Sequence, residues 1–198
     1  MKNFKRFCWS LSILFLVSCA TSKTYAPSQT NTTPRNGFLE NEKIDVVFFD
    51  SRSEKQKSKE VQNSILSYLN KTYPSASFQK LDNSEYFSSP SEDKITIKMN
   101  LAGYNAGFGV ESTSGIGTIN GQPFVFNGVS DGKWNGLTGI QVNLYDYRSG
   151  EKKYSSKISD VVSKPNTGGY STARKALQTS FQNVMNSLAS FLDQSLME

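Results

Sequence analysis

The chain contains 198 residues, with 22 basic and 17 acidic side chains, two cysteines and no histidine. The absence of histidine excludes Ser-His-Asp and Cys-His catalytic systems, an imidazole base near neutral pH and His-rich zinc sites. The two cysteines, Cys8 and Cys19, both lie near the start of the sequence. The rest of the chain therefore cannot form an internal disulfide.

Residues 1–18 have the features of a bacterial export signal. Lys2, Lys5 and Arg6 precede an apolar run over residues 7–17. This run is shorter than the roughly 20 residues that a membrane-spanning helix needs, and it has the length of a signal-peptide core. We expect residues 1–18 to be cleaved off, which removes three positive charges and no acids. No cluster of basic and aromatic residues remains, so nucleic-acid binding is not expected.

The signal ends in Leu16-Val17-Ser18-Cys19. This tetrapeptide resembles the bacterial lipobox, which implies cleavage between Ser18 and Cys19 and attachment of acyl chains such as palmitate at Cys19. The alternative is an ordinary secretory signal whose apolar core happens to end in cysteine. Several acyl chains, at about 0.8 kcal/mol per CH₂, make an effectively permanent anchor. In lipoproteins of the enterobacterial type, a residue other than aspartate after the cysteine implies the outer membrane, so Ala20 leads us to expect that location, facing the periplasm.

Residues 19–42 are rich in Ser, Thr, Asn and Pro. Such a composition is typical of segments that stay disordered, so we expect a lipidated cysteine followed by a flexible tether. A coil of this length would reach on the order of 25 Å from the bilayer. Residues 43–198 have the usual size of one domain and are expected to form a single periplasmic unit.

The first part of this domain predicts a strand, a helix and a second strand. Residues 44–50 form an almost continuous apolar run, which indicates a strand that is covered on both faces. Ser53-Glu54-Lys55-Gln56 fits a capping box, and apolar residues at helical spacing follow it until Tyr73-Pro74. Residues 78–81 form a further candidate strand. The helical apolar positions are Val61, Ile65, Leu66 and Leu69.

Two later segments alternate apolar and polar residues with the period of a half-buried strand. Ser149-Gly150 is expected to turn the second of them back into a third strand over residues 152–161, which gives an antiparallel meander. The alternating apolar residues are Ile95, Ile97, Met99 and Leu101 in the first strand, and Ile140, Val142 and Leu144 in the second.

Between these strands, residues 103–134 are dense in Gly, Ser and Asn, with hairpin signals at Asn120-Gly121 and Asp131-Gly132. The aromatic residues of this stretch are expected to be exposed and to contact a partner. They are Tyr104, Phe108, Phe124, Phe126 and Trp134.

The sequence closes with a helical pattern over residues 171–195, in which apolar residues step along one stripe. The order of strand, helix, strands and helix predicts an α+β fold, with an antiparallel-rich sheet and two helices packed on one face. The stripe is therefore expected to cover the sheet.

This layout resembles small envelope lipoproteins of the curli-secretion, penicillin-binding-protein-activator and ABC-transport-auxiliary type. The resemblance rests on the lipobox, the polar tether, the strand ending in Phe49-Asp50, the segment 134–150 and the long terminal helix. It implies an anticodon-binding-like α+β domain that serves as an accessory or assembly subunit of a larger machine. No functional residue of that group except the lipobox cysteine can be placed on this chain.

Other chemistry receives little support from the sequence. Asp45, Asp50 and Asp82 could belong to a carboxylate pair for glycoside hydrolysis, as could Glu85, Glu92 and Asp93, but solvated acids at loops and strand ends are the better interpretation. The stretch Asp82–Glu85 lacks the glycine and the later glutamate of a calcium loop. We therefore expect no catalytic residue, no metal site and no cofactor.

The sequence favours a lipid-anchored, non-catalytic envelope protein that binds another envelope component. The membrane, through lipid on Cys19, and an envelope protein are the expected partners. The alternative is a periplasmic carrier or sensor of a small apolar ligand, such as lipid, held between the sheet and the helices.

Overall fold

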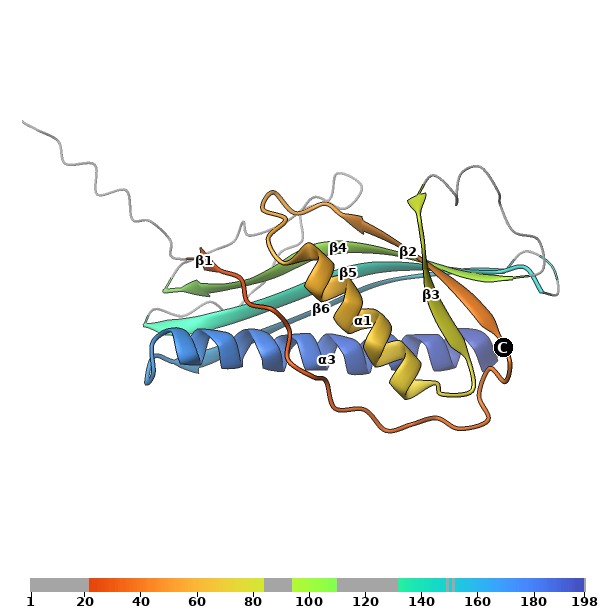
Figure 1. The fold of residues 1–198 in the computed structure, drawn as a ribbon. Coiled ribbons are helices and arrows are strands. Elements are labelled where there is room, and N and C mark those ends of the chain that lie inside the picture. Colours follow the sequence, from red (N-terminus) through yellow and green to blue (C-terminus); the bar gives the residue numbers. More distant parts are fainter. Residues whose placement is uncertain (1–21, 84–93, 110–131, 149, 151, 198) are drawn as a thin grey trace, which may run out of the picture.

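A computed structural model of the chain describes residues 22–83, 94–109, 132–148, 150 and 152–197. In these residues, strands and helices form one α+β unit, in which a long helix runs beside a twisted sheet (Figure 1). The elements are β1 (Ser22–Lys23), β2 (Lys43–Asp50), α1 (Ser58–Thr72), β3 (Ser77–Leu81), β4 (Ile95–Phe108), β5 (Lys133–Asp146), β6 (Lys152–Pro165) and α3 (Tyr170–Met197).

The strands form a mixed sheet in the order β3-β2-β4-β5-β6. The short strand β1 also pairs with β4, outside this order. β2 runs parallel to both β3 and β4, whereas β4, β5 and β6 form an antiparallel meander. The predicted α+β class is confirmed. The sheet is mixed because the connection through α1 returns the chain parallel to β2.

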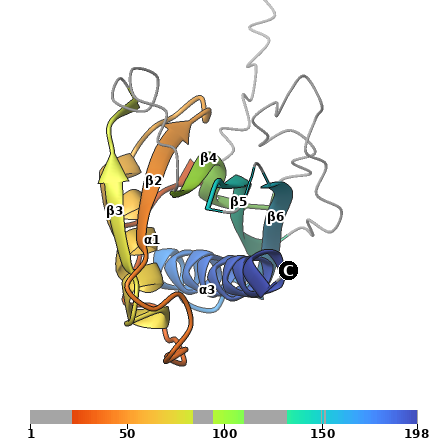
Figure 2. The ribbon, with the colours of Figure 1, turned by 90° about the vertical axis from the view of Figure 1, so that its right-hand side faces the viewer.

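Both helices pack on one face of the sheet (Figure 2), and side chains from both belong to the same core cluster. The register explains this cover, because alternate residues of neighbouring strands lie opposite one another and point to the helices. In the described residues, no helix is long and apolar enough to cross a membrane. The paired core positions are Ile44, Val46 and Phe48 on β2, Ile95, Ile97 and Met99 on β4, and Val142 and Leu144 on β5.

A register shift between Leu101 and Gly103 changes which residues of β4 face the helices. Leu101 lies opposite Ile140 but Gly103 lies opposite Gly139, so β4 contains one extra residue at this point. Such a bulge reverses the alternation of the strand that carries it. Leu101 is the last buried residue before the bulge, and Tyr104 is therefore the next residue on the same buried face.

Helix α1 begins later than the predicted capping box. Lys57 is its N-cap residue, with a left-handed φ of 58° and no capping side chain, so the expectation of a cap at Ser53 is wrong. Val61, Ile65 and Leu69 are buried on the predicted face. The loop before the helix is held in another way, by a buried arginine.

That arginine is Arg52, which forms an ion pair with Asp50 at the end of β2. Its Nε and one terminal nitrogen donate to the two carboxylate oxygens at 2.9 and 2.6 Å. The same guanidinium also donates to the carbonyl oxygens of Tyr104 and Gln56 at 3.4 and 3.2 Å. One buried cation therefore connects β2, β4 and the loop before α1.

Asp146 and Arg148 repeat this geometry at the end of β5, with contacts of 2.9 and 2.7 Å. Here Arg148 also pairs with Glu42 at 2.8 Å, just before β2. The Arg148 side chain is 30% exposed, compared with 6% for Arg52. The two pairs thus share their bonding and differ in burial.

This difference gives a matched test by mutation. Asp50→Asn leaves a buried guanidinium without its countercharge, so we expect it to lower the free energy of unfolding by about 3–5 kcal/mol. Asp146→Asn should cost about 1 kcal/mol or less, because water can solvate Arg148 and Glu42 still supplies a countercharge. Urea denaturation followed by circular dichroism measures both values. Equal losses for the two variants would contradict the assigned role of burial.

The Asp50 pair also predicts a pH dependence. Burial alone would raise the pKa of Asp50, but hydrogen bonds from Arg52 and Ser58 outweigh it and leave the pKa below its ordinary value of 3.8. The pair's contribution is therefore fully present above that ordinary value and is lost as the pH falls through the lower, folded-state pKa. Asp50→Asn should flatten the acid limb of the stability curve.

Candidate functional site

Residues 24–42 do not extend away from the domain as the predicted tether would. They run along the helices, and the preceding strand β1 pairs with β4 through Ser22 opposite Gly107 (Figure 1). Phe38 and Leu39 pack against the core. This differs from the expected disordered segment, because these apolar side chains and the backbone find partners on the domain.

Side-chain and backbone hydrogen bonds fix this segment to α1 and α3. The amide of Gln182 on α3 bonds both backbone groups of Asn31, each at 2.7 Å. Thr32 and Thr72 are joined through their hydroxyls at 2.6 Å. Because Thr72 donates to the carbonyl of Tyr68, it is Thr32 that donates to Thr72.

A second attachment joins Arg35 to the far part of α3. Its Nε lies 2.8 Å from a carboxylate oxygen of Asp193, and its guanidinium lies 5.5 Å from the ring centroid of Tyr73. The single proton of the Tyr73 hydroxyl is shared between an Asp193 carboxylate oxygen and the Ala189 carbonyl oxygen, which lie at 2.8 and 3.0 Å. Burial, and then the hydrogen bond to Asp193, raise the pKa of Tyr73 well above its usual value, so this hydroxyl stays a donor.

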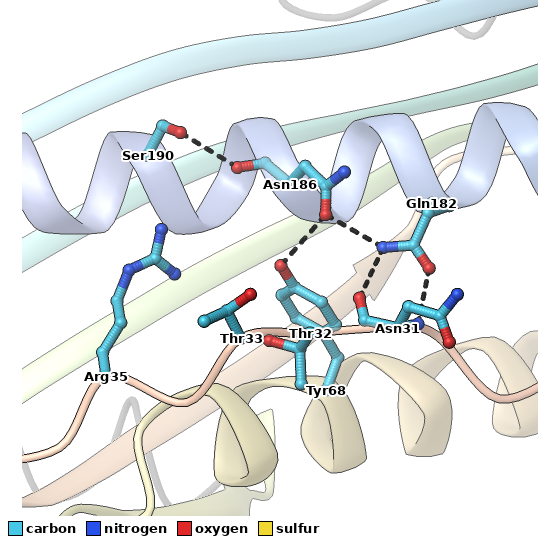
Figure 3. Close-up of a pocket in the computed structure, with 8 residues that line it drawn as sticks. All are labelled: Asn31, Thr32, Thr33, Arg35, Tyr68, Gln182, Asn186 and Ser190. Carbon is cyan, nitrogen blue, oxygen red and sulfur yellow. Dashed lines mark hydrogen bonds between the residues drawn. The ribbon is translucent and has the colours of Figure 1, made fainter.

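Between these two attachments lies a groove of about 570 Å³, bounded by the N-terminal segment, α1 and α3 (Figure 3). Inside it, the Tyr68 hydroxyl and the Gln182 amide converge on the side-chain oxygen of Asn186, at 3.4 and 2.9 Å. We call this the polar groove. Its lining residues are Asn31, Thr32, Thr33, Arg35, Tyr68, Gln182, Asn186 and Ser190.

The lining of the polar groove suits binding better than catalysis. All eight lining residues have polar side chains, and Arg35 is the one with a formal charge. The set offers amide and hydroxyl groups that both donate and accept hydrogen bonds. It contains no carboxylate, thiol or imidazole, so it supplies no general base.

Two other grooves are also lined mainly by polar residues. One, of about 540 Å³, lies between β6 and α3, and its lining includes Ser156 and Gln194. The other, of about 190 Å³, lies between residues 27–30 and α1. None of these three grooves has the apolar lining that a lipid carrier would need.

The aromatic residues predicted as partner contacts have a different role where the structure describes them. Tyr104 and Trp134 are 2% and 4% exposed, so the expectation of exposed contacts is wrong for both. The Tyr104 ring meets Phe181 of α3 edge-on at 5.7 Å, and Trp134 packs against Phe108 at 5.1 Å. Phe108 is partly buried against the core. The bulge in β4 is the physical reason, because it turns Tyr104 inward.

The remaining predicted site residues lie outside the described residues. They are Ser18 and Cys19 of the lipobox, and Phe124 and Phe126.

The candidate acids that are described serve local contacts. The Asp45 carboxylate accepts a hydrogen bond from Gln79 at 2.7 Å, and Asp50 is paired with Arg52. Within the described ranges, no three His, Cys, Asp or Glu residues gather as metal ligands. Glu85, Glu92 and Asp93 lie outside those ranges.

Sequence reasoning missed the polar groove because it treated residues 19–42 as disordered. Tyr25, Phe38 and Leu39 were the available signal, since all three pack partly against the core. Arg35 and Asn31 belong to no sequence motif or apolar periodicity that would mark them as site residues. Their partners, Asp193 and Gln182, lie more than 150 residues later in the sequence.

No protein-family model and no curated protein matches the chain. Among solved structures, it is similar to protein XCC0632 from Xanthomonas campestris, with 9% identity and a TM-score of 0.48 over 87% of this chain and 96% of that one. Protein CT253 from Chlamydia trachomatis has 9% identity and a TM-score of 0.48 over 79% and 98%. Lipoprotein GNA1162 from Neisseria meningitidis has 12% identity and a TM-score of 0.39 over 75% and 99%. Similarities at this level carry no conclusion about function.

The buried position of Trp134 predicts a stability effect. Trp134→Ala should lower the free energy of unfolding by about 3–5 kcal/mol, because it empties a large site in the core. Its neighbour Tyr170 is 57% exposed, so Tyr170→Ala should cost less than about 1 kcal/mol. Denaturation followed by far-ultraviolet circular dichroism measures both without relying on tryptophan fluorescence. A small decrease in the free energy of unfolding for Trp134→Ala would instead indicate that Trp134 is a surface residue.

Proposed function

We propose that the protein is a lipid-anchored, non-catalytic component of the bacterial envelope that binds another envelope protein through the polar groove. The observation that carries this proposal is the groove itself, which the segment following the lipobox helps to build. The proposed anchor at Cys19 and one wall of the groove thus belong to one continuous stretch of chain. The proposed location is the outer membrane, facing the periplasm.

The chemistry of the groove supports a binding role. Asn186 and Ser190 are exposed on α3, and Thr33 is exposed across from them on the N-terminal segment. An extended polypeptide offers alternating amide donors and carbonyl acceptors, which amide and hydroxyl side chains can match. The volume falls within the range of about 300–1,000 Å³ that is usual for binding sites. An accessory or assembly subunit needs such a surface and no catalytic group.

The alternative of an apolar-ligand carrier lacks a supporting observation in the described residues. Tyr104 and Phe181 fill space between the sheet and α3 with their rings in contact. Leu188 and Leu192 of α3 are fully buried. We therefore carry forward the binding of a protein partner.

The proposal is tested by crosslinking in cells, with affinity purification of a C-terminally tagged protein and mass spectrometry. Thr33→Trp places a large side chain in the groove, whereas Asn36→Trp changes an exposed residue three positions along that does not line it. We expect one specific envelope protein to be captured by wild type and Asn36→Trp and to be lost with Thr33→Trp.

Cys19→Ala provides the unanchored control and should also reduce the capture. Equal capture by both tryptophan variants would reject the groove as the binding site. Specific hydrolase activity of the pure protein, abolished by changing a single carboxylate, would reject the non-catalytic assignment.

A further inference from the structure

The end of the domain where α3 begins gathers segments that are far apart in the sequence. β1, the last residues of β4, the first residues of β5 and the last residues of β6 all lie at this end, opposite the C-terminus (Figure 1). The pairings confirm it, because Lys23 lies opposite Ala106, and Trp134 lies opposite both Phe108 and Lys164.

Three aromatic rings at this end contact one another in sequence, each tilted against the next. The rings of Phe108 and Trp134 are 5.1 Å apart, and those of Trp134 and Tyr170 are 5.8 Å apart. The indole nitrogen of Trp134 donates to Asn166 at 3.1 Å, which fixes the ring. Tyr170 is 57% exposed, so a buried aromatic base supports a large projecting ring.

Two cations each lie over a tyrosine ring at this end. The Lys23 amine lies 5.2 Å from the centroid of Tyr170, and the Arg174 guanidinium lies 5.2 Å from the centroid of Tyr25. Residues 22–30, 104–109, 132–138 and 161–175 contain five basic residues and no Asp or Glu. We call this surface the cationic end, defined by Lys23, Lys133, Lys164, Tyr170, Arg174 and Lys175.

The position of the lipobox limits how far this surface can lie from the lipid. Cys19 is three residues before Ser22, and Ser22 is held in place opposite Gly107. Three extended residues span at most about 11 Å. A lipid on Cys19 therefore enters the bilayer close to the cationic end, and not at the end of the longer tether that composition suggested.

We infer that the cationic end is a membrane-docking surface, which lies on the headgroups of a bilayer that contains anionic lipid. The inference rests on the lipid anchor of the proposed function and adds a fixed orientation to it. Tyrosine favours the boundary between headgroups and acyl chains, which suits the exposed ring of Tyr170, and Lys and Arg are attracted to anionic headgroups. Within the described segments of this end, the five cations have no Asp or Glu among them, whereas Glu111 and Asp131 border these segments outside the described residues.

This orientation has a consequence for the polar groove. Helix α3 has 28 residues and therefore extends about 42 Å from the cationic end. Gln182 lies near its middle and Asn186 and Ser190 lie in its second half, so docking holds the groove away from the lipid surface. A partner in the periplasm could then reach it.

The test compares two probes on one helix. The full chain with its native signal is purified in lipidated form and reconstituted into vesicles of phosphatidylethanolamine and phosphatidylglycerol that contain spin-labelled lipid. A fluorophore is attached to Ser171→Cys, beside Tyr170, or to Gln194→Cys. Both positions are exposed, and they are separated by about 35 Å along α3. We expect strong quenching at Ser171→Cys and little at Gln194→Cys.

The charge-reversal variant Lys23→Glu/Arg174→Glu/Lys175→Glu tests the role of the cations. It should lose the quenching at Ser171→Cys while the protein stays in the vesicle fraction through its lipid. Wild type in vesicles of phosphatidylcholine alone should show the same loss. Undiminished quenching in both cases would overturn the electrostatic part of the inference.

Equal quenching at the two probe positions, or none at Ser171→Cys in vesicle-bound protein, would overturn the docking surface and would leave a partner protein as the occupant of this end. The mass of the purified N-terminus separates this result from failure of the proposed function. Protein with an unmodified Cys19 would reject the anchor, whereas lipidated protein without quenching at Ser171→Cys would reject only the orientation.

Discussion

The arrangement of this domain depends on the close approach of α3 to the middle of the sheet. At Gly136 of β5 a side chain is excluded, because a Cβ atom would lie 2.2 Å from backbone atoms of Ala176 and Leu177. No rotamer change can relieve a contact with backbone. The small residue therefore sets the distance between helix and sheet, and Ala173 and Ala176 are buried on the facing side.

Helix α3 contacts both the sheet and the N-terminal segment. Its buried face covers the meander of β4, β5 and β6, while its other side provides Gln182 and Asp193 to the N-terminal segment. The Tyr73 hydroxyl at the end of α1 also bonds α3, through the Ala189 carbonyl. The polar groove exists because one helix is packed to the sheet at a fixed height and is bordered by α1 and the segment.

The sequence was sufficient for the fold class and for most elements, because their apolar periodicity is strong. The alternation from Ile95 to Leu101 and from Ile140 to Leu144 corresponds to paired strands whose core faces match. It was insufficient where one inserted residue changes which side chains of a strand face the core. The bulge after Leu101 buries Tyr104, and the apolar pattern of the strand does not predict it. The candidate site was missed for another reason: its bonds join residues 31–35 to residues 182–193, and polar pairs so distant leave no periodic signal.

Residues 22–42 are packed on the folded domain, so the proposed lipid anchor at Cys19 would lie close to it. Hydrogen exchange of the lipidated protein, read by mass spectrometry on peptides of this segment, tests this packing most directly. The backbone amides of Asn31, Arg35 and Asn41 donate to protein acceptors, so their exchange should be slowed well below the rate of a free peptide. Free-peptide exchange across residues 22–42, with α3 still protected, would show a detached tether and contradict the account.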